Sequence, residues 1–458
     1  MALLTSYSKK NDLCLLSSNR TKAMAKRGFF RDFMGVLNSN VVSLVSALLM
    51  VVVLTRVMGT DGYGAYNALI VVPLIVVSLT HLGIRGASIY LIGSKKYDEN
   101  HLVSSIVLIL IGSSTIGILL SAIGFYFYRE PSFTLLLISL VLFVIPFRLA
   151  TIYVGGVFLG KDEIKKSNQL NWMINVINLV LAAVLVWWLD YGLLGAVIAT
   201  LAANAWVAMV AMRMLTKNFE IKIIYHPVIV KHLLRMGLLF SMSFFILQLN
   251  YKVDILLLEK LSTINEVGLY ALATQIAEQL WQIPLAVGIV LFSRTSNDGG
   301  QILPSSVIAL TRTTFIIVFI MAAALFLLAP FVIPLVFGNA FSASSLMLQI
   351  ILPGIVILTF FRVLSGQLAG MGKPQVTLYI FGPALVINIL LNFLWIPDHG
   401  GKGAAMASNV SYLMGSLGYW IYYARLNQLS LFELFHFRKT DFDSLSSLFK
   451  KVKTKWTN

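Results

Sequence analysis

The sequence predicts an all-α membrane protein of about twelve transmembrane helices, arranged in two halves of six. Three observations carry this prediction: the composition, the recurrence of long apolar runs, and an internal repeat. The 458 residues are 58% hydrophobic and only 12% charged, with a mean hydropathy of +0.85. A chain of this composition has too few polar groups to cover a water-soluble surface, so we expect it to lie in a bilayer.

Apolar runs of roughly 20 residues recur along the chain, and each is long enough to cross a hydrocarbon layer of about 30 Å as a helix. The expected spans are residues 33–55, 65–92, 101–127, 134–159, 168–189, 191–215, 233–258, 266–292, 303–329, 343–371, 375–396 and 403–425. Residues 1–32 are basic and lack the apolar core of a cleavable signal, so we expect a cytoplasmic arm. Residues 426–458 are predicted to form a basic amphipathic cytoplasmic tail on the membrane surface.

An internal repeat divides the chain. Its landmarks pair Gly64 and Tyr66 with Gly268 and Tyr270, Phe147-Arg148 with Phe361-Arg362, Gly160-Lys161 with Gly372-Lys373, and Gly195-Ala196 with Gly403-Ala404. We therefore expect an N-terminal half over 33–215, a cytoplasmic linker over 216–232 and a C-terminal half over 233–425. Because six is even, both halves have the same orientation, which makes this a parallel repeat about an axis along the membrane normal. Such folds place a substrate path between the halves.

Lysine and arginine predict the orientation, since loops rich in them stay in the cytoplasm. With the N-terminus inside, 26 of the 35 lysines and arginines fall in inner segments and four in outer ones. Both termini are therefore predicted to be cytoplasmic. The net charge of +16 expresses this topology and the anionic lipid surface, so no nucleic-acid partner is expected. The single cysteine, Cys14, excludes an internal disulfide and a cysteine-based metal cage, and no metal or cofactor is expected.

Polar side chains follow single faces of several expected spans. In the second span Ser78, His81, Arg85 and Ser88 share a face, as do Gln275, Glu278, Gln279 and Gln282 in the eighth. Asparagine stripes occupy the fifth span, at 168, 171, 175 and 178, and the eleventh, at 388 and 392. Lipid cannot satisfy these groups, so they must face protein or water. For the asparagines we favour hydrogen bonding between helices over ligand contact.

Ionisable side chains inside the spans point to a pathway, because an intramembrane charge costs about 2.5–3.5 kcal/mol even on the lenient insertion scale. The bases are Arg85, Arg148, Lys252, Arg312 and Arg362, and the acids are Asp254 and Glu278. This excess of positive charge would attract a diphosphate, which arginine can grip bidentately. We therefore predict a cationic substrate cavity of Arg85, Arg148, Lys252 and Arg362, supported by His81, Gln275 and Gln279. The alternative is internal pairing, for instance of Lys252 or Arg85 with Glu278.

The motifs support a family resemblance. Leu54-Thr55-Arg56-Val57-Met58-Gly59, Gly62-Tyr63-Gly64-Ala65-Tyr66, Lys252-Val253-Asp254-Ile255-Leu256-Leu257 and Val267-Gly268-Leu269-Tyr270-Ala271 resemble the polysaccharide and O-antigen flippases. These belong to the superfamily of multidrug, oligosaccharidyl-lipid and polysaccharide exporters. The resemblance implies a V-shaped exporter fold in the bacterial cytoplasmic membrane. It also implies transport of an undecaprenyl-diphosphate-linked oligosaccharide, with the polymerase and chain-length proteins of the pathway as partners.

The mechanism that we predict is alternating access, in which the halves rock to expose one cavity first inward and then outward. No nucleotide-binding loop is present, so the energy would come from an ion gradient or from consumption of product. Asp254 and Glu278 are the candidates for proton or sodium coupling, because a carboxylate removed from water can bind a proton near physiological pH.

Three other functions are compatible with parts of this sequence. A multidrug antiporter of the same superfamily would be expected to carry carboxylates for cationic drugs, and the first span has none. Lipid II flippases usually carry two further spans, and the segment after Arg425 is too charged to supply them. A membrane enzyme generally carries a large loop or a catalytic domain, which the short connections do not offer, so no catalytic residue is assigned.

Overall fold

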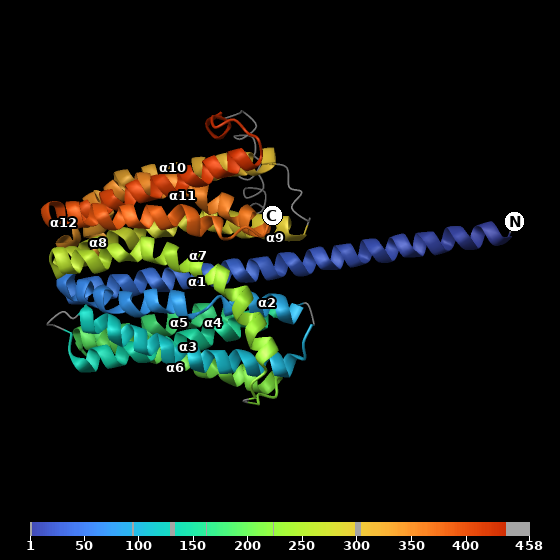
Figure 1. The fold of residues 1–458 in the computed structure, drawn as a ribbon, viewed down its shortest axis with the longest axis horizontal. Coiled ribbons are helices and arrows are strands. Elements are labelled where there is room, and N and C mark those ends of the chain that lie inside the picture. Colours follow the sequence, from blue (N-terminus) through green and yellow to red (C-terminus); the bar gives the residue numbers. More distant parts are fainter. Residues whose placement is uncertain are drawn as a thin grey trace.

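The structure is a computed structural model that describes residues 2–93, 96–128, 133–161, 163–222, 224–297 and 304–436. Within these ranges, side chains are described from Val41 onward, except at 93, 164, 239–240, 289–290, 293–294, 296–297 and 435. The elements are α1 (Ala2–Thr80), α2 (Ile84–Gly93), α3 (Glu99–Phe127), α4 (Leu135–Gly160), α5 (Ile164–Ala182), the π-helix η1 (Ala183–Trp188), α6 (Gly192–Asn218), α7 (Pro227–Leu261), α8 (Ile264–Glu278), η2 (Gln279–Trp281), α9 (Gln282–Asn297), α10 (Pro304–Phe337), η3 (Asn339–Phe341), α11 (Ser344–Gly370), α12 (Val376–Leu426) and η4 (Glu433–Phe435). The described part of the chain contains no strand, which confirms the predicted all-α class (Figure 1).

The twelve expected spans each correspond to a helical segment. By length and composition, nine helical stretches of the described residues can cross a membrane. Two of them, Val41–Ile92 and Val376–Leu426, contain 52 and 51 residues, enough for two crossings each at 1.5 Å per residue. The remaining span is the eighth, which η2 divides into α8 and α9. In Figure 1, α1–α6 and α7–α12 gather into two adjoining groups.

Each double crossing turns at one glycine. Gly59 has φ 66° and ψ −169°, and Gly400 has φ 55° and ψ −136°. Positive φ is open to glycine without the steric cost that a Cβ imposes. Both turns lie at the same end of the bundle, because Asn265 Nδ2 donates to Thr60 Oγ1 at 2.6 Å and the backbone nitrogen of Gly401 donates to Oε2 of the adjacent Glu266 at 2.7 Å. The connections between these spans are therefore tighter than the sequence indicates.

The second span is broken, although the sequence reads as one apolar run. α1 ends at Thr80, and α2 begins at Ile84 after a turn in which Leu82 has φ 50° and Gly83 has φ 61°. Neighbouring helices donate hydrogen bonds to carbonyl oxygens at the break: Leu79 O accepts from Ser241 Oγ at 3.0 Å, and Thr80 O accepts from Tyr153 Oη at 3.3 Å. Broken helices in membranes persist where neighbouring groups take up their polar backbone in this way.

Two repeat-related glycines meet where the halves touch. A Cβ on Gly64 would lie 2.0 Å from Ile264 O and 2.9 Å from the nitrogen of Gly268, and one on Gly268 would lie 2.1 Å from Thr60 O. Ala68 and Ala271 continue the same faces of α1 and α8 and are 0% and 3% exposed. We call this contact, formed by Gly64, Ala68, Gly268 and Ala271, the seam.

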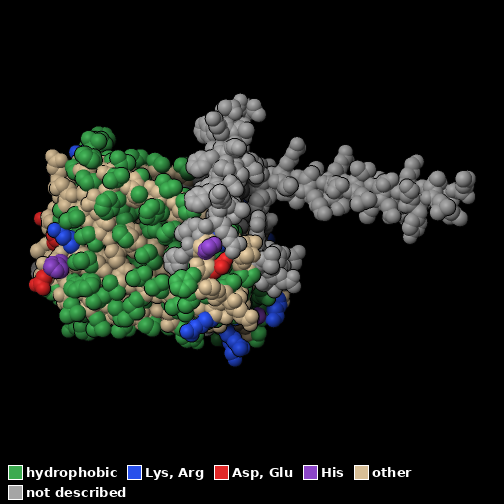
Figure 2. Space-filling model, turned by 90° about the horizontal axis from the view of Figure 1, so that it is seen from above, with side chains coloured by type: hydrophobic (Ala, Val, Ile, Leu, Met, Phe, Trp, Pro, Cys, Tyr) green, Lys and Arg blue, Asp and Glu red, His purple; other side chains and the backbone are tan. Residues whose placement is uncertain are grey.

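The surface matches a bilayer environment. Figure 2 shows mainly hydrophobic side chains on the viewed face, with the charged ones gathered toward the two ends. Tyr126, Phe127, Trp187 and Trp188 are between 70% and 82% exposed, at the ends of α3 and of η1. Aromatic residues of this kind form belts at the membrane–water interface.

The terminal segments and the linker differ from simple loops. The backbone of the expected arm continues into the first span as α1. Of the expected linker, only residues 219–226 lie between α6 and α7. The tail turns back onto the C-terminal half, where Leu434 is 1% exposed and Arg312 donates a hydrogen bond to the carbonyl oxygen of His436. Residues 437–458 lie outside the described residues.

Candidate substrate path

Arg85 and Arg148 line one polar cavity in the N-terminal half. We call it the two-arginine pocket; its volume is about 230 Å³, and its lining is Ser43, Arg85, Arg148, Thr151, Ile152, Gly155, Ser167, Asn171, Ile174 and Asn175. Arg85 comes from α2 directly after the break, and Arg148 comes from α4. The two helices approach closely at Gly156, where a Cβ would lie 2.9 Å from the Cα of Arg85. No carboxylate is among these lining residues.

The asparagine stripe of α5 faces this pocket. Asn171 and Asn175 line it, and Asn175 also donates a hydrogen bond to Ser43 Oγ on α1. The stripe thus makes the predicted bond between helices and also supplies amides to the cavity. The sequence favours hydrogen bonding between helices over ligand contact for these asparagines. The sequence signal for their role in lining the pocket is the four-residue spacing of Asn171 and Asn175, which puts both amides on one face of α5.

His81 has a structural position at the break. Its Nδ1 accepts a hydrogen bond from the backbone nitrogen of Gly83 at 2.8 Å, and its ring packs on Phe244 with centroids 5.1 Å apart. His81 therefore stabilises the turn that precedes Arg85. Its ring also contacts the C-terminal half, through Phe244 of α7.

Lys252 forms the internal pair that was the alternative to substrate contact. Its Nζ lies 2.7 Å from Glu278 Oε1, and the two side chains are 17% and 25% exposed. The charges of this pair offset each other. Among the described intramembrane bases of the predicted cavity, Arg85, Arg148 and Arg362 are left without a carboxylate within salt-bridge distance.

Arg362 is held by aromatic rings. Its Cζ lies 4.6 Å from the ring centroid of Trp281 and 5.1 Å from that of Tyr251. Arg362 and Arg148 are equivalent in the repeat, yet the first is surrounded by rings and the second by hydroxyl and amide groups. The predicted cationic set is therefore distributed over two chemically different environments, one in each half.

Asp254 lies in a separate, fully buried cluster of the C-terminal half. Its carboxylate is 0% exposed and accepts hydrogen bonds from Tyr270 Oη at 2.8 Å, from Asn392 Nδ2 at 2.7 Å and from Ser408 Oγ. Asn392 also donates to Asn388 Oδ1 at 3.1 Å. We call Asp254, Tyr270, Asn388, Asn392 and Ser408 the buried carboxylate cluster. All its donors to Asp254 are neutral, and the asparagines of the eleventh span face this carboxylate.

Gln275 and Gln279 lie beside the seam. Tyr63 Oη donates to Gln275 Oε1 at 2.5 Å across the two halves, whereas Gln279 Nε2 donates to the backbone oxygen of Gln275 at 3.0 Å. Asn265 adds a second link, since its Nδ2 donates to Thr60 Oγ1 at 2.6 Å and to Asp61 Oδ1 at 3.0 Å. The halves are thus hydrogen-bonded to each other at the end where Gly59 turns. Within the described residues, no group of three or more metal-ligating side chains occurs.

Family profiles match the chain in two places. The profile described as polysaccharide biosynthesis protein matches residues 30–292, more than half of the chain, and the profile described as MatE matches residues 240–394. An uncharacterized membrane protein of Methanocaldococcus jannaschii is 25% identical over 145 residues, which make up 31% of this chain and 34% of that protein. The chain thus matches about a third of the length of this curated relative.

Two solved structures have the same fold. The lipid II flippase MurJ in an inward closed conformation gives a TM-score of 0.73 at 15% identity and covers 92% of each chain. An inward-facing multidrug resistance MATE family transporter of the MOP superfamily gives a TM-score of 0.68 at 15% identity, covering 84% of this chain and 94% of that one. These likenesses confirm the exporter fold of two halves that the sequence resemblance implied.

Proposed function

Because the chain belongs to the polysaccharide biosynthesis protein family, we propose that it is a flippase that moves an undecaprenyl-diphosphate-linked oligosaccharide across the bacterial cytoplasmic membrane. The oligosaccharide would serve O-antigen, capsule or exopolysaccharide synthesis, with the polymerase and chain-length proteins of that pathway acting downstream. In this proposal both termini face the cytoplasm. The observation that supports it most is the two-arginine pocket, because it suits the one group common to all such substrates, the diphosphate.

The charge of this pocket favours an anion with more than one negative charge. Arg85 and Arg148 contribute two positive charges, and the lining residues contribute no negative one. Two guanidinium groups can make paired hydrogen bonds to phosphate oxygens, and the neighbouring asparagine amides can add further donors. Burial in a low-dielectric bundle strengthens each of these bonds relative to water. The prenyl chain would remain in the lipid during transport.

Movement of the two halves would require the contacts of the seam to separate. The halves touch at the end where Gly59 and Gly400 lie, which is the outer end in the proposed topology. In this arrangement the outer side is closed, and the cycle requires the seam and the hydrogen bonds of Tyr63 and Asn265 to separate. Rocking of the two halves about their interface would then expose the cavity outward.

A lipid II flippase is the second candidate, favoured by the fold shared with MurJ over 92% of both chains. Both candidates require a site for a lipid-linked diphosphate, so the two-arginine pocket does not separate them. The MatE profile over residues 240–394 raises a multidrug antiporter as a third. For that candidate we expect protection of cells against cationic dyes, whereas the flippase proposal predicts none.

Deletion of the gene tests the proposal directly. We expect the lipid-linked repeat unit to accumulate on the inner leaflet and the surface polysaccharide to disappear, with both restored by the wild-type gene. Unchanged surface polysaccharide together with dye sensitivity would contradict the flippase proposal and favour an antiporter. Loss of cell wall synthesis would instead favour lipid II.

Asp254 is the better candidate for ion coupling, because Glu278 is paired with Lys252 while Asp254 meets only neutral donors. Asp254→Asn keeps the size of the side chain but removes the negative charge. We expect transport in proteoliposomes to lose its dependence on a proton or sodium gradient and to fall about 10-fold, equivalent to about 1.4 kcal/mol. A gradient dependence equal to that of the wild type would exclude Asp254 as the coupling group.

Glu278→Gln is expected to lower the stability of the folded protein. It leaves the Lys252 ammonium partly buried without its carboxylate, which costs about 1–3 kcal/mol. The melting temperature in detergent should fall, and the gradient dependence should persist in the protein that remains folded. The matched control is Glu99→Gln, since Glu99 pairs with Lys161 at the same 2.7 Å but with side chains 42% and 32% exposed. That pair should contribute at most about 1 kcal/mol.

A further inference from the structure

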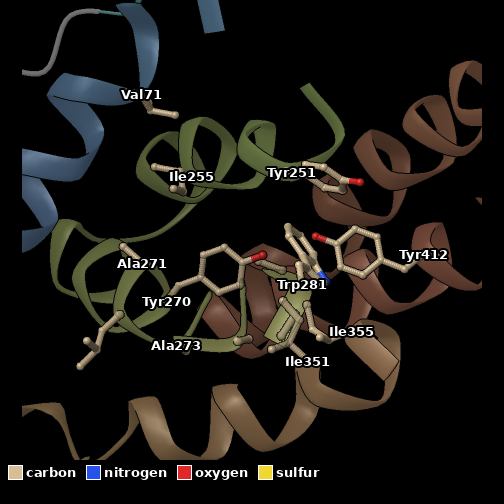
Figure 3. Close-up of a cluster of buried hydrophobic side chains, with 14 of the residues drawn as sticks. Val71, Tyr251, Ile255, Tyr270, Ala271, Ala273, Trp281, Ile351, Ile355 and Tyr412 are labelled. Carbon is tan, nitrogen blue, oxygen red and sulfur yellow. The ribbon is translucent and has the colours of Figure 1, made fainter. Parts of the chain in front are cut away.

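Two aromatic side chains of the C-terminal half lie against one guanidinium, that of Arg362. Tyr251 from α7 and Trp281 from η2 have ring centroids 4.7 Å apart, and the Arg362 guanidinium lies over both. Tyr412 from α12 meets the two rings edge-on at 5.8 and 6.0 Å (Figure 3). We call Tyr251, Trp281 and Arg362 the aromatic–arginine box. Because the rings cover a face of the guanidinium, its planar edge is the part that can form hydrogen bonds.

The box contains hydrogen-bond donors that the protein does not use. Tyr251 Oη, Trp281 Nε1 and Arg362 Nε are buried and have no hydrogen-bond partner among the described residues. Both rings are 6% exposed. Burial of an unpaired donor is costly, and an acceptor-rich group bound beside these three side chains could satisfy them. Oxyanions are such groups, since each oxygen accepts several hydrogen bonds.

The net charge around the box favours an oxyanion with a single negative charge. Lys252 is adjacent to Tyr251 in sequence, and Glu278 lies one helical turn before Trp281; these two offset each other. Arg362 therefore supplies a single positive charge, whereas the two-arginine pocket supplies two. A monoanion matches the box, and a diphosphate matches the pocket.

We propose that Tyr251, Trp281 and Arg362 form a saccharide subsite that binds the carboxylate of an acidic sugar in the transported oligosaccharide. This inference rests on the proposed function and divides the substrate between the halves. The N-terminal half takes the diphosphate on hydroxyl, amide and arginine groups. The C-terminal half takes the sugar acid on an arginine in the equivalent position of the repeat, where aromatic walls exclude water and strengthen the bonds to the carboxylate.

Calorimetric titration of the full chain in nanodiscs tests the subsite with three probes: D-glucuronate, D-glucose and inorganic pyrophosphate. We expect glucuronate to bind at least about 10-fold more tightly than glucose. Tyr251→Phe, which removes one hydroxyl, and Arg362→Lys, which keeps the charge, should weaken glucuronate about 10- to 100-fold and leave pyrophosphate within about twofold. Arg148→Lys should weaken pyrophosphate binding and leave glucuronate binding within about twofold. Unchanged melting temperatures would show that each variant is folded.

The outcomes separate the subsite from the function on which it rests. Equal affinity for glucose and glucuronate, or unchanged glucuronate binding in Tyr251→Phe, overturns the subsite. Loss of pyrophosphate binding in Arg362→Lys but not in Arg148→Lys also overturns it, because the box would then be the phosphate site. Failure of pyrophosphate to bind the wild type, with glucuronate binding still sensitive to Tyr251→Phe, supports the subsite and counts against the diphosphate pocket.

Discussion

Replacing Arg148 or Arg85 with alanine is expected to abolish export of the lipid-linked glycan while the protein still inserts. Each arginine can make charge-assisted hydrogen bonds to the diphosphate, and each such bond contributes about 1.5–3 kcal/mol. Loss of one arginine should therefore lower affinity at least about 10- to 100-fold. Because the pocket lining contains no charged group besides these two arginines, no other side chain can replace the lost guanidinium. Surface polysaccharide in a deletion strain is the measurement.

A second pair of variants distinguishes the contribution of the positive charge of each arginine from that of its planar guanidinium. Arg148→Lys and Arg85→Lys keep the positive charge but lose the planar fork, so we expect partial rescue. Arg213→Ala is the control, since Arg213 is exposed on α6 and away from the two-arginine pocket; it should export normally. Full export by the alanine variants at both pocket positions would rule out the pocket as the diphosphate site.

Replacing Gly64 or Gly268 with valine is expected to stop transport by holding the seam apart. A Cβ on either glycine would lie 2.0 to 2.1 Å from a backbone oxygen of the other half, closer than real contacts allow. Backbone cannot move aside as a side chain can, so the halves must separate at this end. The closed state then becomes inaccessible, and a transporter confined to one state cannot cycle.

Cysteine labelling reports the separation. Ala271, which is 3% exposed in the seam, is replaced with cysteine in a chain whose Cys14 is replaced with serine. We expect a membrane-impermeant maleimide to label this cysteine from outside in Gly64→Val but not in the parent chain. Gly112→Val is the matched control, because a Cβ at Gly112 meets nothing within 4 Å. Labelling that stays absent in Gly64→Val would contradict the seam as the closure of this end.

The sequence predicts the architecture well because its signals are local or periodic. Apolar length places the spans, and the repeat of Gly64 with Gly268 and of Arg148 with Arg362 indicates the two halves. The meeting of the equivalent residues Gly64 and Gly268 in the seam is a finding of the structure. The excess of basic residues inside the spans also directs attention to Arg148 and Arg85, which the structure brings into one cavity.

The remaining features depend on contacts between distant helices, which hydropathy does not encode. The break at Leu82 and Gly83 lies inside an apolar run, and its carbonyl oxygens also accept hydrogen bonds from Ser241 and Tyr153 on other helices. The sequence places Lys252 in the substrate cavity, with pairing to Glu278 as the alternative. The structure shows the alternative, since Glu278, 26 positions away, lies 2.7 Å from Lys252. Two of the three donors to Asp254, Asn392 and Ser408, likewise come from a helix 138 and 154 positions along the chain, so the neutral surroundings of Asp254 do not show in the sequence.

Reconstitution tests the central claim most directly. The protein is placed in liposomes that carry an undecaprenyl-diphosphate-linked oligosaccharide, and an externally added glycosidase measures the fraction of glycan exposed on the outer leaflet over time. We expect wild-type protein to render the inner-leaflet glycan accessible and Arg148→Ala to leave it protected, at equal protein content. Protection of the inner-leaflet glycan in wild-type liposomes, or equal exposure with Arg148→Ala, would contradict the account.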